Sequence, residues 1–266
     1  MGTAGAGGDV SPLIRIEGLQ KIYAANTASP VHALSSIDLD IADGEFVAVV
    51  GPSGCGKSTL LRILAGLDDH DGGDLTLAGQ AVSGPSTDVG FVFQAANLLP
   101  WLTVRDNVRL PLRVGKAAKA AGADIDALLD MTGLADFGHR YPYELSGGMQ
   151  QRAGICRALA RNPKILLMDE PFGALDALTR ERMNLELQRI WETSGKTIVL
   201  ITHSISEAVF LGDRVVVMSA RPGRVVADIT IPIPRPRSLD GIIGHPEYQR
   251  ITREIRHLLN AQGEVD

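Results

Sequence analysis

The sequence has few of the features that mark secreted, nucleic-acid-binding or membrane-spanning proteins. Two cysteines in 266 residues cannot make a disulfide framework and lack metal-ligand spacing, which favours a reducing cytosol. Basic residues do not predominate, because 26 Lys and Arg stand against 31 Asp and Glu, so we expect no nucleic acid as a partner. No uncharged run supplies the roughly 20 apolar residues of a spanning helix. The N-terminus has no basic segment followed by an apolar one, and we expect no signal peptide.

What the sequence does have is a globular composition arranged as alternating strands and helices. Hydrophobic residues make up 45% of the chain and charged residues 21%, enough to bury a sizeable core. The apolar runs Phe46–Val50, Ile165–Met168 and Thr197–Thr202 are typical of strands buried on both faces of a parallel sheet. A helix is expected over Ala177–Trp191, between the last two strands. This alternation predicts an α/β fold.

The strongest motif follows the first of these strands. It consists of nine residues: Gly51, Pro52, Ser53, Gly54, Cys55, Gly56, Lys57, Ser58 and Thr59. They fit the phosphate-binding pattern G-x-x-x-x-G-K-[ST], with the strand before and a helix after. Backbone N–H groups of such a loop converge on phosphate oxygens, and the helix adds its positive end. Lys57 supplies a charge for the β- and γ-phosphates, and the Ser58 hydroxyl can ligate Mg²⁺. The alternative, a structural glycine turn, is disfavoured by these flanks.

Two acidic residues, Asp169 and Glu170, follow a second apolar strand. The carboxyl ends of strands are where open α/β sheets bind ligands. Because side chains alternate along a strand, we expect the two carboxylates on opposite sides. One can hold Mg²⁺ through water while the other polarises an attacking water. A solvated strand end is the alternative, and the phosphate-binding loop disfavours it.

A third segment, Leu145–Gln150, reads L-S-G-G-M-Q at the expected start of a helix. Ser146 can cap this helix, and Gly147 and Gly148 leave backbone N–H groups open to an anion. Taken alone, the segment could be a plain helix start.

Together the three motifs resemble the nucleotide-binding domain of ABC transporters, over about residues 13–225. The resemblance implies a P-loop NTPase core with a mainly parallel sheet, an N-terminal antiparallel β-subdomain and an inserted helical subdomain. It implies ATP and Mg²⁺ as cofactors and ATP hydrolysis as the activity. It also implies a head-to-tail dimer in which each ATP lies between the P-loop of one chain and the L-S-G-G signature of the other.

The resemblance assigns roles to further residues on the nucleotide. Tyr23 would stack on adenine, and Gln94 would approach Mg²⁺ and the attacking water. Asp169 would hold Mg²⁺ with Ser58, Glu170 would be the general base, and His203 would be the switch histidine on the γ-phosphate. Tyr23 could instead be an exposed turn aromatic, Gln94 a strand-end residue that satisfies its own loop, and His203 a structural histidine.

Other roles concern the dimer. Ser146, Gly147 and Gly148 would contact the γ-phosphate of the ATP held by the other subunit. Asp176 would lie at the dimer interface, and it could also cap the following helix. Cys55 and Cys156 are interpreted as packing residues without a redox role.

The resemblance and the composition of the sequence also indicate domain boundaries. Residues 1–12 are rich in Gly and Ala, and a disordered tail is expected there. Residues 13–235 would form the ABC ATPase domain, with the helical subdomain at about 95–162. Residues 236–266 would form a C-terminal extension with an amphipathic helix. This helix is predicted from four apolar residues at helical spacing: Ile251, Ile255, Leu258 and Leu259.

The expected partners are a second ATPase subunit (a homodimer), two transmembrane permease subunits and, indirectly, an external solute-binding protein. Such a protein would lie on the cytoplasmic face of the inner membrane. An apolar loop, Leu98–Leu102, follows Gln94 and contains Trp101. Because exposed apolar clusters are costly, this loop is interpreted as part of a cleft for a permease helix. Burial within the helical subdomain is the alternative.

The segments FQAANLLPWLTVRDNV, DEPFGALDALTRERM and RPGRV resemble the importer branch for nitrate, sulfonate, taurine and bicarbonate. Ser204 departs from the Asp that many relatives have. About 40 residues follow the Arg221–Arg224 turn, too few for the regulatory β-domain of sugar-importer ATPases. That turn could be a charged surface loop. The alternatives are an ABC importer ATPase for another solute, a soluble ABC ATPase acting on DNA or ribosomes, and a regulatory module without turnover.

Overall fold

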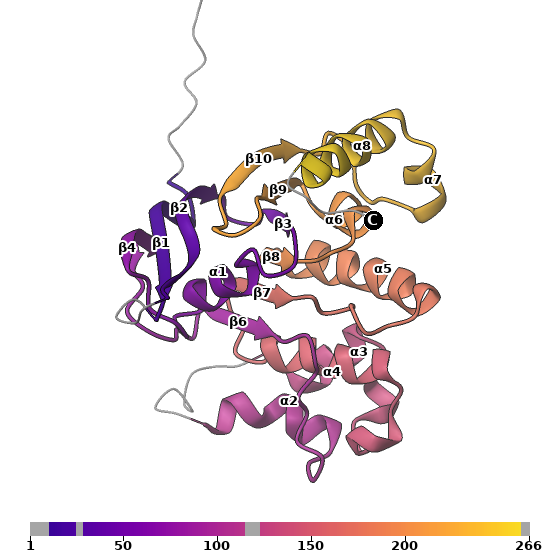
Figure 1. Cartoon of the computed structure of the whole chain (residues 1–266). Helices are drawn as coiled ribbons and strands as arrows, with labels where there is room; N and C mark the ends of the chain where they lie inside the picture. Colours follow the sequence, from indigo (N-terminus) through magenta and orange to yellow (C-terminus); the bar gives the residue numbers. More distant parts are fainter. Residues whose placement is uncertain (1–10, 25–28, 115–122, 262–266) are drawn as a thin grey trace, which may run out of the picture.

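A larger, mainly parallel sheet and a smaller, antiparallel sheet organise the chain (Figure 1). The computed structural model describes residues 11–24, 29–114 and 123–261, so most of the tail expected at 1–12 lies outside the described residues. The strands of the larger sheet are β3 (Phe46–Val50), β6 (Val89–Val92), β7 (Ile165–Asp169), β8 (Thr197–Ile201), β9 (Arg214–Met218) and β10 (Val225–Thr230). They lie in the order β10-β9-β3-β8-β7-β6, and every neighbouring pair is parallel except β10 with β9.

Strand β3 shows why the larger sheet is buried on both faces. Its five residues are at most 1% exposed. Phe46, Ala48 and Val50 belong to one hydrophobic cluster, while Val47 and Val49 belong to the other. Side chains alternate along a strand, so one short apolar run supplies two layers. Full burial of a valine stabilises the fold by about 1.5–3 kcal/mol relative to its exposure.

The antiparallel sheet and one helix cover the Val47 side of the larger sheet. The sheet consists of β2 (Val31–Ile41), β1 (Ile14–Tyr23), β4 (Gly72–Leu77) and β5 (Gln80–Ala81), in that order. Helix α1 (Lys57–Leu64) follows β3, and its buried Leu60, Leu61 and Leu64 join the same cluster. The loop between β3 and α1 therefore connects two elements that are both buried in this cluster.

Helices cover the other side of the larger sheet, and further helices form a separate lobe (Figure 1). Helices α5 (Ala177–Ser194) and α6 (Ile205–Leu211) pack on the sheet. The lobe contains α2 (Val104–Arg113), α3 (Ile125–Met131) and α4 (Gly147–Leu159), with 3-10 turns at Ala135–Phe137 and Pro142–Glu144. Among the described residues, no helix is long and apolar enough to pass through a membrane.

The end of the described chain packs against the sheet's helical side. After β10, an irregular stretch leads to α7 (Leu239–Ile243) and α8 (Pro246–Ala261). Ile251 and Ile255 of α8 are 0% exposed and belong to the same cluster as Phe46. Helix α8 therefore shares the core of the main domain, and its apolar stripe is the one that the sequence predicts.

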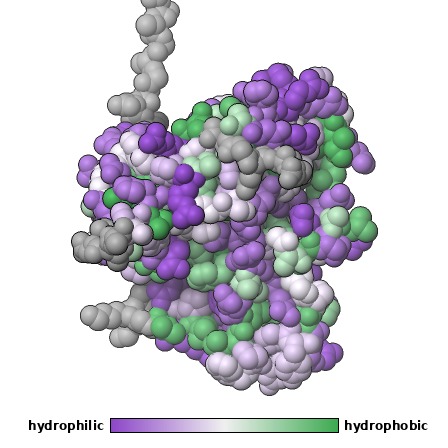
Figure 2. All heavy atoms as spheres, viewed as in Figure 1, coloured by the Kyte–Doolittle hydropathy of each residue, from purple (hydrophilic) through white to green (hydrophobic). Residues whose placement is uncertain are grey.

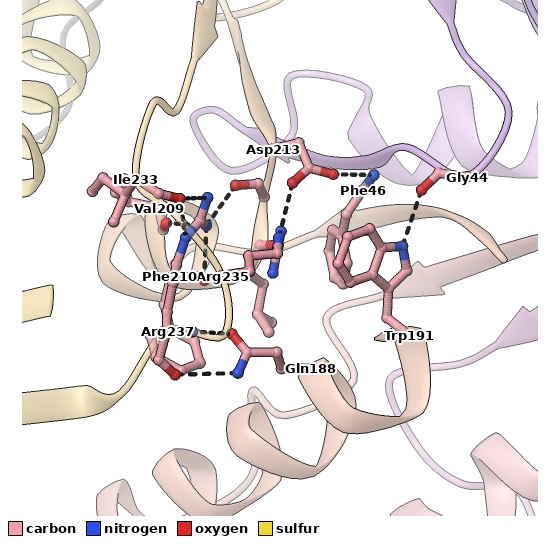
Figure 3. A network of polar contacts seen from close by, with 12 residues as sticks. Gly44, Phe46, Gln188, Trp191, Val209, Phe210, Asp213, Ile233, Arg235 and Arg237 are labelled. Carbon is pink, nitrogen blue, oxygen red and sulfur yellow. Dashed lines mark hydrogen bonds and ion pairs between the residues drawn. The ribbon is translucent and has the colours of Figure 1, made fainter. Parts of the chain in front are cut away.

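A buried arginine joins this C-terminal stretch to α6 (Figure 3). Arg237 is 4% exposed, and its guanidinium donates to the carbonyls of Val209, Phe210 and Gly212 at 3.0, 2.9 and 2.7 Å. Carbonyls at the end of a helix lack partners within it, so the arginine caps α6. Burial lowers the pKa of Arg237 to about 10, and the side chain stays charged at neutral pH. Gln188 of α5 closes the network through the Arg237 backbone.

Arg237→Ala should lower the free energy of unfolding by about 3 kcal/mol, because the carbonyls that end α6 lose their buried donor. Arg253→Ala, an exposed position on α8, is the control and should change it by less than about 0.5 kcal/mol. Urea unfolding measures both. Equal losses in the two variants would contradict the capping role.

Candidate active site

The carboxyl ends of the parallel strands meet at one edge of the larger sheet. The P-loop follows β3, Asp169 ends β7, and His203 comes two residues after β8. The P-loop, Glu170 and His203 border a hollow of about 280 Å³, with Asp169 behind Ser58. It is lined by Tyr23, Val31, Ala33, Ser53, Gly54, Gly56, Lys57, Ser58, Thr59, Glu170, His203 and Arg221. Most of the predicted P-loop thus faces one space, together with Tyr23, Glu170 and His203.

The P-loop owes its shape to a glycine and a lysine. Gly56 has φ +99°, and a Cβ there would lie 2.8 Å from the Ala33 carbonyl oxygen, so a side chain is excluded by conformation and by space. Lys57 is 5% exposed, and its Nζ donates to the carbonyls of Gly51 and Pro52 at 2.6 and 2.9 Å. The lysine bends back over its own loop and places a positive charge inside it.

Ser58 and Asp169 form an oxygen-rich pair beside the P-loop. The Ser58 hydroxyl donates to Oδ1 of Asp169 at 3.0 Å. Burial raises the pKa of Asp169, and the Ser58 hydrogen bond and the Lys57 charge oppose that shift. A hydroxyl and a carboxylate at the edge of a phosphate-binding loop are ligands of the kind that Mg²⁺ takes. The residues therefore fit the predicted metal.

Glu170 and His203 form a second pair at the hollow. Nε2 of His203 lies 2.5 Å from Oε1 of Glu170. The expected strand alternation does not set the direction of Glu170, because β7 ends at Asp169 and Glu170 has φ +46°. A positive φ is costly for a residue with a Cβ and is typical of functional positions. The two carboxylates nevertheless separate, one toward Ser58 and the other toward His203.

Tyr23 is fixed by one residue of the P-loop motif and by one residue outside the motifs. Its hydroxyl lies 3.3 Å from Thr59 Oγ1 and 3.3 Å from Asp68 Oδ2. Asp68 is in turn bound by Arg62 at 2.8 Å, and this hydrogen bond is the main cause of the lowered pKa of Asp68. Tyr23 remains 39% exposed, so its ring is available to a flat ligand. No sequence motif marks Asp68.

Gln94 lies beside a neighbouring cavity of about 180 Å³ rather than in the hollow itself. This cavity shares Glu170 and His203 with the hollow and also contains Glu207. Burial raises the pKa of Glu207. The sequence analysis missed this carboxyl, although its place in the first turn of α6 could have been read as a capping position.

The signature and Asp176 do not line the hollow of their own chain. Ser146 caps α4 by accepting from the Met149 N–H at 3.4 Å, and Asp176 caps α5 by accepting from the Thr179 N–H at 3.0 Å. The two helix starts touch, because a Cβ on Gly148 would lie 3.0 Å from a Thr179 methyl. The structure therefore brings the signature and Asp176 to one surface and separates them from the P-loop.

The remaining predicted residues of the P-loop, and Asp169, do not face the hollow. Gly51, Pro52 and Cys55 do not line the hollow, and Asp169 reaches it only through Ser58. Cys55 is 0% exposed, with its Sγ 3.8 Å from Lys57 Nζ. Cys156 is also 0% exposed. Both positions agree with the interpretation of the cysteines as packing residues.

This arrangement defines a P-loop ATPase, and the comparisons with known proteins specify which kind. The profile of the ABC transporter family matches residues 34–173. A taurine import ATP-binding protein, TauB, of Rhizobium johnstonii is 47% identical over 94% of this chain and 97% of its own length. A bicarbonate transport ATP-binding protein, CmpC, of a Synechocystis species is 43% identical over 96% of this chain but 39% of its own length.

Solved structures agree with the sequence relatives. The dimeric post-hydrolysis structure of the ATP-binding cassette MJ0796, bound to ADP and phosphate, superposes with a TM-score of 0.70 at 36% identity. It covers 83% of this chain and all of that one. The chain belongs to the ABC transporter family and is an ATP-hydrolysing cassette. The predicted fold class and ATPase activity are confirmed.

Both thiols should react slowly in the folded protein. Burial raises the pKa of Cys55 and raises that of Cys156 to about 11. At pH 8 a thiol with a pKa of 11 is about 0.1% thiolate, against roughly a quarter for a free cysteine. Ellman's reagent at pH 8 should label the native chain at least about tenfold more slowly than the urea-unfolded chain. Rapid labelling of either native thiol would contradict the packing role.

Proposed function

We propose that this chain is the ATP-hydrolysing motor of an importer for a small solute. Two identical chains would work on the cytoplasmic face of the plasma membrane, with two permease subunits and an external solute-binding protein. The observation that carries the proposal is the grouping of Lys57, Ser58, Glu170 and His203 around one hollow while the signature lies elsewhere on the chain. The importer assignment is supported by the relatives named for taurine import and bicarbonate transport.

The residues divide the work of hydrolysis. Backbone N–H groups of the P-loop and Lys57 would bind the phosphates and stabilise charge in the transition state. Ser58 and Asp169 would hold Mg²⁺, which would neutralise charge on the β- and γ-phosphates. Glu170 would orient the attacking water and accept its proton, and Gln94 would approach the water from the neighbouring cavity. His203, which lies at hydrogen-bond distance from Glu170, would contact the γ-phosphate.

The separation of the signature from the P-loop explains the need for a second copy. Ser146 and Gly147 start α4 at the surface, with Gly148 buried just behind them, and a γ-phosphate held by another chain would reach this helix N-terminus. Asp176 lies beside them at the start of α5. ATP would join the two chains, and hydrolysis would release them. The dimeric MJ0796 structures support this arrangement.

The permease would dock on the helical lobe beside Trp101. This side chain is 70% exposed, in a loop whose backbone is fixed by the fully buried Asn107. Leu98 of the same loop packs on the core. Hydrophobic residues are also visible over the lobe in the space-filling view (Figure 2). A hydrogen-bonded loop that packs its half-buried leucine on the core and presents its tryptophan is suited to receive a partner.

Glu170→Gln should keep the fold and ATP binding but remove the proton acceptor. ATP turnover should fall at least about a hundredfold, and light scattering should show a stable dimer in saturating Mg-ATP. Lys57→Ala is the comparison and should bind ATP at least about tenfold more weakly. A Glu170→Gln chain that stays monomeric in Mg-ATP would contradict the shared-site mechanism.

Trp101→Glu should uncouple transport from hydrolysis, because a charge replaces the apolar docking side chain. The ATPase activity of the isolated chain should stay within about twofold of wild type, while solute uptake by the reconstituted complex should be lost. Val226→Glu, a change of the same kind at an exposed apolar residue of β10, should affect neither. Loss of nucleotide binding in Trp101→Glu would count against the docking role.

A further inference from the structure

The turn between β9 and β10 is rigid. The Ser219 hydroxyl accepts from the Arg224 N–H at 3.0 Å and lies 3.1 Å from the Pro222 carbonyl. The Ser219 N–H donates to the Arg224 carbonyl at 2.9 Å. The ends of the turn are thus tied together by one serine, so the turn holds Arg221 in a defined place.

The same turn is fixed to strand β2. The Gly223 N–H donates to the Ala33 carbonyl at 2.9 Å, and its carbonyl accepts from the Ser35 N–H at 3.0 Å. Ala33 also borders the P-loop, because a Cβ on Gly56 would meet its carbonyl oxygen at 2.8 Å. Neighbouring residues of strand β2 therefore contact both the turn and the P-loop.

The turn also touches the P-loop directly. A Cβ on Gly223 would lie 2.1 Å from the Cys55 carbonyl oxygen, and one on Gly51 would lie 3.0 Å from the Met218 carbonyl oxygen at the end of β9. Only glycine allows backbones to approach this closely. Gly223 of the turn thus packs against Cys55 of the P-loop, and the end of β9 packs against Gly51.

Arg221 is the side chain of this turn that lines the hollow. It is exposed, and within the described ranges no hydrogen bond or ion pair engages its guanidinium. Two cationic side chains, Lys57 and Arg221, line the hollow, whereas the carboxylate that lines it is that of Glu170. The Lys57 ammonium is already bound to two loop carbonyls, whereas Arg221 keeps its donors for a ligand.

We propose that the Arg221 guanidinium binds the phosphate tail of the nucleotide, as a cationic contact outside the P-loop. The inference rests on the proposed placement of ATP in this hollow. Arginine keeps its charge at any physiological pH and presents paired N–H donors that match phosphate oxygens. In this role the turn is a second wall of the phosphate site, and not a charged surface loop.

The phosphates are a better match than the base because of where the turn is attached. The turn that carries Arg221 packs through Gly223 against the Cys55 carbonyl of the P-loop, and Arg221 lines the hollow together with Ser53, Gly54 and Gly56. Tyr23, the proposed adenine contact, is held instead by Thr59 and Asp68, beyond the start of α1. Adenine also offers no negative charge to a guanidinium, while the phosphate tail carries several.

The test measures dissociation constants of ATP, ADP and GTP by isothermal titration calorimetry for wild type, Arg221→Ala and Arg221→Lys. The constants of all three nucleotides should rise about tenfold in Arg221→Ala, as for the loss of one charge-assisted contact. Arg221→Lys should recover part of the loss. The salt dependence of ATP binding should weaken in Arg221→Ala, because one cation fewer meets the phosphates.

Arg224→Ala is the matched control, because this arginine belongs to the same turn but reaches Ser35 at 3.5 Å instead of the hollow. It should bind nucleotides as wild type does. Three results would overturn the proposal: ATP binding within about twofold of wild type in Arg221→Ala, an equal loss in Arg224→Ala, or a change in the ratio of ATP to GTP affinity. Undiminished ATP binding by Lys57→Ala would instead refute the placement of the nucleotide.

Discussion

The site depends on parallel strands that end at one edge of a sheet. Parallel pairing places the residues after β3, β7 and β8 side by side, although they are far apart in the sequence. Burial on both faces fixes those strands, so the polar residues that follow them have little freedom. Ser58 can therefore meet Asp169, and Glu170 can meet His203, at hydrogen-bond distance. The proposed metal binding uses the first of these contacts, and the proposed activation of water uses the second.

The surface proposed to act on another chain is formed by two helix caps and one contact between the helices. Ser146 and Asp176 each cap their own helix, and the contact between Gly148 and Thr179 joins the two helix starts. These bonds need no nucleotide and no partner. In the proposed dimer this surface needs no reordering within its own chain, so ATP would supply only the link between the two chains.

The parallel strands and the strand, loop and helix around Gly51 can be predicted from the sequence, because those signals are short and local. The apolar run before Gly51 and the S-G-G start of α4 each set their own conformation. The contacts made across the fold could not be predicted in this way. Asp68 holds Tyr23 from a loop with no motif, and Arg237 caps a helix that ends 26 residues before it. Glu170 follows the end of its strand with a positive φ, so the predicted separation of the two carboxylates comes from a turn and not from strand alternation.

The position of Lys57 has a consequence for how a ligand enters. Its ammonium donates to the carbonyls of Gly51 and Pro52, so the lysine stabilises the conformation of the loop. In the proposed site, an incoming phosphate would replace the two carbonyls as the partner of Lys57, and the lysine side chain would already be in place. The ordering entropy of that side chain is already lost on folding. The loop is thus preorganised, and selectivity rests on whether an anion can outcompete two neutral carbonyls for one charge.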